Sequence, residues 1–149
     1  MEQKKVFEYS LCDAWHMPIR TIMISEGDKN TVLLTGSSTR FSPESMGELI
    51  EINDTIMSEI KRIIHDSGVM KFKKVEENMD VFVLDGYIHE FCFAQDESYH
   101  TIWVCNLDTY QRYKKKYPKA AALLTLLHKL KVLLVPEGVN GEFFRLTSG

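Results

Sequence analysis

The sequence of 149 residues lacks the motifs that identify several large classes of enzyme and metalloprotein. It has only three cysteines, and no two of them have the CxxC spacing of zinc ribbons and thiol oxidoreductases. It has no GxGxxG or GxxxxGK[ST] motif, so the common glycine-rich phosphate loops are excluded. The local signature of a nucleophile elbow is also missing. The sequence therefore predicts no catalytic residue, no metal site and no cofactor.

Long hydrophobic runs are missing as well. The longest nearly apolar stretch, Ala120 to Val135, contains His128, Lys129 and Lys131 and is too short to cross a bilayer. Met1 to Lys5 leads directly into a predicted strand rather than into the apolar segment of a signal peptide. The odd number of cysteines also argues against a set of paired disulfides. We therefore expect free thiols, a cytoplasmic location and no membrane partner.

The chain carries only a small excess of negative charge, with a formal net charge of −3. Binding to nucleic acid relies on many Lys and Arg contacts to phosphate, so DNA and RNA are not expected partners. The basic segment from Arg112 to Lys119 is interpreted as a solvated surface. Residues 1–80 hold 10 Lys and Arg against 14 Asp and Glu, whereas residues 81–149 hold 8 against 7. The acidity is thus concentrated in the first half of the chain.

The clearest structural pattern lies between Val81 and Cys105, where two turns separate three β-rich runs. Asp85-Gly86 is typical of a two-residue hairpin, and a second reversal is predicted at Gln95 to Ser98. If Ala94 pairs with Tyr99, side-chain alternation fixes both faces of this meander. One face then carries Phe82, Leu84, Tyr87, His89, Phe91, Phe93, His100, Ile102 and Val104. The other carries Val81, Val83, Ile88, Glu90, Cys92, Ala94, Tyr99, Thr101, Trp103 and Cys105.

The two faces of the meander raise two questions. His89 and His100 share a face that is mainly aromatic, so we interpret them as hydrogen-bonded packing residues rather than as metal ligands. For the face that carries Tyr99 and Trp103, two interpretations stay open. Either helices cover both sides of the sheet and these residues are core, or the face is partly open and forms a partner site, where Tyr and Trp are enriched.

The remaining chain completes an α+β fold in a single domain of residues 1–149. We predict a mostly antiparallel sheet with two major helices, in an order of about βββαβββα(β). One helix is predicted to begin at Ser42-Pro43 and to end before Gly68, and the other to begin at Pro118 and end at Pro136 to Gly138. Strands are expected at residues 6–11, 19–24 and 31–35, with a short final edge strand at 143–146. The pattern at residues 70–75 is ambiguous and could form a short edge strand.

The order of these features resembles the immunity proteins of bacterial toxin systems, including contact-dependent growth inhibition. The resemblance rests on an N-terminal meander, a long acidic helix, the run Val83-Leu84-Asp85-Gly86-Tyr87, then Asn106 and the helix that opens at Pro118. It implies a non-enzymatic protein that binds a cognate toxin domain, such as a nuclease, and blocks its active site. An acidic surface would steer it to a basic partner. The candidate partner-binding residues are Glu44, Glu48, Glu51, Asp54, Glu59, Glu76, Glu77, Asp80, Tyr99 and Trp103.

Two other functions remain open. The protein could be a small ligand-binding domain or enzyme with a pocket near His89, Glu90 and His100. It could also be an oligomeric adaptor, such as a homodimer, that pairs through a sheet edge or through the Trp103 face.

Overall fold

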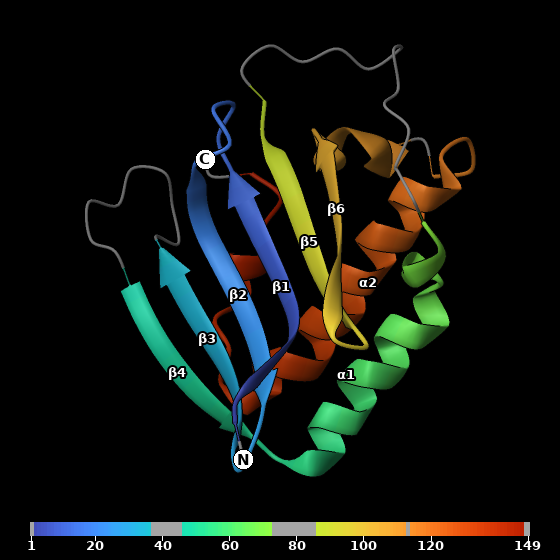
Figure 1. Cartoon of the computed structure of the whole chain (residues 1–149). Coiled ribbons are helices and arrows are strands. Elements are labelled where there is room, and N and C mark those ends of the chain that lie inside the picture. The colour runs from blue at the N-terminus through green and yellow to red at the C-terminus, as the bar shows by residue number, and fades with distance from the viewer. Residues whose placement is uncertain (1, 37–45, 73–85, 113, 148–149) are drawn as a thin grey trace.

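The sheet contains six antiparallel strands within residues 2–36, 46–72, 86–112 and 114–147, which are the residues that the computed structural model describes. In space the order is β4-β3-β2-β1-β5-β6, and two helices pack behind it (Figure 1). The α+β class, the antiparallel sheet and the two major helices are therefore confirmed. The strands are β1 (Lys4–Cys12), β2 (Pro18–Glu26), β3 (Asn30–Gly36), β4 (Met46–Ile52), β5 (Ile88–Gln95) and β6 (Ser98–Cys105).

The β5–β6 hairpin has the predicted register. Ala94 pairs with Tyr99, and the turn falls between Gln95 and Ser98. Residues 81–85, and with them most of the predicted Asp85-Gly86 hairpin, lie outside the described residues. The entry to β5 is held by Asn106, whose backbone N–H donates to the Tyr87 carbonyl at 2.8 Å.

β4 corrects the predicted start of the first helix. The residues from Met46 to Ile52 form a strand, because alternate side chains such as Ile50 and Ile52 can face inward beside β3 while Leu49 and Glu51 face outward. In so short a run, a mixture of apolar and polar residues fits either the 3.6-residue period of a helix or the two-residue period of a strand. Ser42 to Glu44, where we predicted the helix cap, lies outside the described residues.

The first helix, α1 (Asp54–Ser67), is separated from β4 by a single residue. The side chain of Asn53 caps it by accepting the N–H of Ile56 at 2.9 Å. It ends as predicted at Gly68, whose φ of 76° is the left-handed conformation that suits glycine. The possible edge strand at residues 70–75 does not form at its start, because η1 (Val69–Lys71) is a 3₁₀ turn, and residues 73–75 lie outside the described residues.

The second helix, α2 (Pro118–Leu134), begins at the predicted proline and packs against α1. A 3₁₀ turn, η2 (Leu107–Arg112), precedes it and another, η3 (Val135–Glu137), follows it. The core lies between the helices and one face of the sheet. It includes Phe7, Tyr9, Ile22, Ile24, Leu34, Ile60, Phe91, Phe93, Leu123, Leu126 and Leu130. No helix within the described residues is long and apolar enough to span a membrane.

The predicted final strand at residues 143–146 is wrong. The chain forms a 3₁₀ turn, η4 (Gly141–Phe144), which buries Phe143 and Phe144 in the core instead of pairing them with a strand. Arg20 of β2 holds the segment that follows, since its buried guanidinium donates to the backbone carbonyls of Arg145 and Thr147 at 3.0 and 2.9 Å. These contacts join the C-terminal segment to the sheet.

Candidate functional site

One face of the sheet has no helix on it in the described part of the chain (Figure 1). We call it the open face. It is formed by the side chains that alternate away from the core. By strand pairing they are Leu49 and Glu51 of β4, Thr31, Leu33 and Thr35 of β3, Thr21 and Met23 of β2, Glu8 and Ser10 of β1, Ile88, Glu90, Cys92 and Ala94 of β5, and Tyr99, Thr101, Trp103 and Cys105 of β6.

Large apolar side chains are exposed on and beside this face. Tyr99 and Trp103 are each 52% exposed and Leu49 is 63% exposed. Trp15 and Met17, in the turn between β1 and β2, are also largely exposed. The interpretation of the Trp103 face as core is therefore wrong. Exposed aromatic side chains that lie together, as Tyr99 and Trp103 do on β6, are typical of an interaction surface.

Polar contacts organise the side chains between these apolar positions. The Lys5 ammonium lies 4.8 Å from the centre of the Tyr99 ring and 3.3 Å from a carboxylate oxygen of Glu8. In the middle of the sheet, the hydroxyls of Ser10 and Thr21 are hydrogen-bonded at 3.0 Å. The face thus has a polar centre, with an aromatic pair on β6 and aliphatic side chains toward β4.

The predicted acidic residues do not form one stripe on a helix. Glu48 and Glu51 both lie on β4. They are an odd number of residues apart, so side-chain alternation places them on opposite faces of the sheet, and Glu51 is on the open face. Glu51 pairs with Lys29 at 3.2 Å. Of the predicted partner-binding residues, the structure brings Glu51, Tyr99 and Trp103 to the same face.

The other acidic candidates lie elsewhere. Asp54, at the start of α1, accepts a hydrogen bond from Asn30 at 2.8 Å. Glu59, farther along α1, pairs with Arg62, and this contact lowers the pKa of the Glu59 carboxyl. Glu44, Glu76, Glu77 and Asp80 lie outside the described residues.

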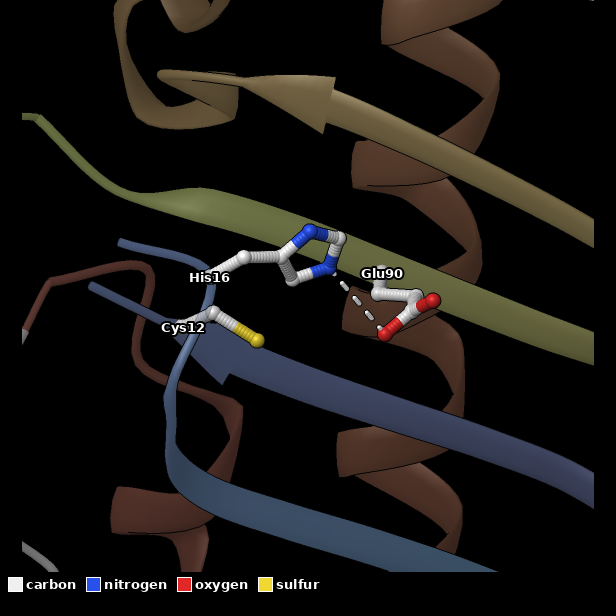
Figure 2. A group of neighbouring side chains, drawn as sticks. All are labelled: Cys12, His16 and Glu90. Atoms are coloured by element: carbon white, nitrogen blue, oxygen red, sulfur yellow. Dashed lines mark hydrogen bonds and ion pairs between the residues drawn. The ribbon is translucent and has the colours of Figure 1, made fainter. Parts of the chain in front are cut away.

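At one end of the open face, three side chains converge that the sequence analysis did not bring together. Cys12 ends β1, His16 lies in the following turn, and Glu90 lies on β5 (Figure 2). One potential ligand atom from each lies within 4.8 Å of the others. The His16 Nε2 atom is 3.4 Å from Glu90 Oε2. The Cys-x₃-His spacing was visible in the sequence, but Glu90 joins it only through the pairing of β1 with β5.

The turn that carries His16 is held by Asp13. Its carboxylate accepts the backbone N–H groups of Trp15 and Met17 at 2.9 and 3.0 Å, and its backbone carbonyl accepts the N–H of His16 at 3.0 Å. His16 has a φ of 63°, an uncommon value for a residue with a side chain. These bonds keep the imidazole beside Glu90 and 6.1 Å from the Trp103 ring.

The Cys12 thiol is not an activated nucleophile. Burial raises its pKa to about 11, and the nearby carboxylates of Glu90 and Asp13 act in the same direction. The thiol therefore keeps its proton at neutral pH, whereas a reactive cysteine needs a lowered pKa. The cluster offers three ligand types without the thiolate that covalent catalysis requires.

Neither His89 nor His100 lines either of two surface hollows, of about 770 and 700 Å³, found among the described residues. His89 is fully buried, and its Nδ1 atom is 2.8 Å from the Tyr9 hydroxyl. Burial, with a smaller effect from Arg20, lowers the pKa of His89 to about 3, so the ring is neutral.

No family model matches this sequence, and no curated protein matches it. The geometry of the open face is therefore the basis for the function proposed next.

Proposed function

We propose that this protein acts without catalysis, by binding another protein through the open face. The observation that carries the proposal is the exposure of Tyr99 and Trp103 on a sheet face that no described helix covers. Trp and Tyr, together with Arg, are enriched among the side chains that contribute most of the binding energy at interfaces. Because both lie on β6 four residues apart, they point the same way and stand roughly 13 Å apart.

The strand framework supports this use. The open face belongs to a sheet whose strands are each hydrogen-bonded to their neighbours, and the opposite face is packed on the helices. A surface built in this way does not need to become ordered on binding, which lowers the entropic cost of association. The aliphatic row of Leu49, Leu33 and Met23 offers a second apolar region on the same face.

The finer form of the proposal concerns the partner. We propose a cognate toxin domain, bound in the cytoplasm of the cell that makes both proteins. The resemblance to toxin immunity proteins supports this, together with the acidic balance of residues 1–80. Glu8, Glu51 and Glu90 place carboxylates on the open face. Each has a basic side chain beside it, and a basic partner surface would compete for these carboxylates.

The test is co-purification with the product of the adjacent gene, followed by measurement of affinity for variants. Trp103→Ser is expected to weaken binding by about 30-fold, since truncating a central interface aromatic costs about 2 kcal/mol or more and 1.4 kcal/mol is tenfold. Val132→Ser is the matched control, because Val132 is 61% exposed but lies on α2. Equal affinities for the two variants would exclude the open face as the contact.

Self-association through the same face is the adaptor alternative. Sedimentation of the purified protein over a range of concentrations separates the two. A dimer that Trp103→Ser dissociates would show that the partner is a second copy of this chain. A monomer at all concentrations would favour a different protein as partner.

A further inference from the structure

Cys12, His16 and Glu90 bring together a thiol, an imidazole and a carboxylate from three segments of the chain (Figure 2). We propose that these three side chains bind a divalent transition-metal ion, with Zn²⁺ as the best match. Zinc is bound in proteins by cysteine sulfur, histidine nitrogen and carboxylate oxygen. The site adjoins the proposed partner surface, with which it shares Glu90, but its test needs no partner. It replaces our expectation from the sequence that the protein has no metal.

The distances suit a tetrahedral ion. With metal–ligand bonds of about 2.0 to 2.3 Å, two ligand atoms on a tetrahedral zinc are roughly 3.4 to 3.6 Å apart. The His16 Nε2 to Glu90 Oε2 distance of 3.4 Å already has this value, and it is long for a hydrogen bond. Since all three ligand atoms lie within 4.8 Å of one another, side-chain shifts of about 1 Å would complete the set around an ion.

The chemistry of the three groups selects the ion. When the metal binds, the Cys12 thiol releases its proton to solvent and the sulfur forms a bond to the metal. The thiolate and the Glu90 carboxylate together balance the charge of a divalent cation, and the neutral His16 ring supplies a nitrogen. Mg²⁺ and Ca²⁺ prefer oxygen ligands, so a set with sulfur and nitrogen disfavours them.

The location gives the ion a route in and an open coordination position. The side chains of His16 and Glu90 are 42% and 37% exposed, so the site opens to solvent even though Cys12 is buried. Three protein ligands leave the fourth tetrahedral position for water. Cys105 does not complete the set, because it is two strands from Cys12 across Ile88, at a distance of about 10 Å.

The turn between β1 and β2 holds His16 in position before a metal ion binds. Asp13 fixes the turn through hydrogen bonds to two backbone N–H groups, and His16 keeps its positive φ within it. A ligand that is already in position loses little conformational freedom when the metal arrives. An ordinary surface ion pair between His16 and Glu90 would need neither this turn nor the sulfur of Cys12.

Cobalt substitution tests the site in the full-length protein, because Co²⁺ bound to a thiolate gives a charge-transfer band in the near ultraviolet. Wild type is expected to bind one Co²⁺ per chain with this band and to lose the band on addition of Zn²⁺. Cys12→Ser should abolish the band. Cys105→Ser, a change at a cysteine outside the proposed ligand set, should keep it.

Cys12 is buried, so loss of the band in Cys12→Ser would have the same appearance if that variant misfolded. A second variant provides an independent test. His16→Asn changes an exposed residue, and asparagine tolerates the positive φ found there. It should retain the wild-type circular dichroism spectrum and weaken Co²⁺ and Zn²⁺ binding by more than the roughly 10- to 100-fold typical of changes outside the ligand set. No band in wild type at excess Co²⁺, a band that survives Cys12→Ser, or unchanged affinity in His16→Asn would each overturn the proposal.

Discussion

The buried histidine His89 should make the fold sensitive to mild acid. It is fully buried beside Tyr9, and burial lowers its pKa from 6.5 to about 3. In the unfolded chain the ring takes up a proton as the pH falls through 6.5, whereas the folded state takes it up only near pH 3. The unfolded state therefore binds more protons between these values, so the free energy of unfolding falls as the pH falls.

The magnitude follows from the two pKa values. One pKa unit corresponds to 1.36 kcal/mol, so lowering the pH from about 7 to about 5 should remove about 2 kcal/mol through this residue. The loss attributable to His89 is complete below pH 3, where both states are protonated. For a domain whose total stability is about 5 to 15 kcal/mol, the part lost by pH 5 is a substantial fraction.

Urea unfolding at about pH 7 and about pH 5, for wild type and for His89→Gln, measures the effect. Glutamine does not titrate and can still form a hydrogen bond with the Tyr9 hydroxyl. The fall in unfolding free energy between the two pH values should be smaller in His89→Gln by about 2 kcal/mol. His128→Gln, at an exposed position of α2, should behave as wild type does.

A result in which His89→Gln and wild type lose the same stability between the two pH values would refute the reasoning. It would mean that His89 can be protonated within the folded protein. The alternative of a functional pocket near His89 would then regain support, because a ring that titrates in the native state can exchange protons with solvent.

Two further predictions concern stability and are measured by chemical denaturation. Gly36→Ala should cost at least about 1 to 3 kcal/mol, since Gly36 has a φ of 97° and an added Cβ would collide with the backbone carbonyl oxygen of Ile19. Gly47→Ala is its control, because an added Cβ there meets nothing within 4 Å, and equal losses would contradict the steric explanation. Asn53→Ala should cost about 1 kcal/mol through loss of the α1 cap. Ser58→Ala, at an exposed position within α1, should cost much less, and the reverse order would show that the cap is unimportant.

Much of the sheet could be predicted because its signals are local. The turn at Gln95 to Ser98 and the alternation on either side of it are enough to set the β5–β6 register, including the Ala94–Tyr99 pair. Pro118 and Gly68 likewise mark a helix start and a helix end through their own backbone preferences. Each of these signals acts within a few residues of the structure that it specifies.

The errors arose where two structures fit the same local pattern. Met46 to Ile52 has apolar residues that suit one turn of a helix or one side of a strand, and the pairing of Ile50 with Val32 of β3 decides for the strand. Phe143 and Phe144 belong to a residue type that is common in strands, yet burial of both rings against the core favours a 3₁₀ turn. In both cases a contact with a distant part of the chain determined the outcome.

By itself, the sequence determined the α+β class, the β5–β6 register and the division of that hairpin into two faces, since turns and alternation are encoded in neighbouring residues. Only the tertiary structure decided which face is exposed, because that depends on where α1 and α2 pack. It also brought Cys12 and His16 to Glu90, through the antiparallel pairing of β1 with a strand more than seventy residues later. Residues so far apart in the chain share no local pattern, so their meeting follows from the packing of the whole sheet.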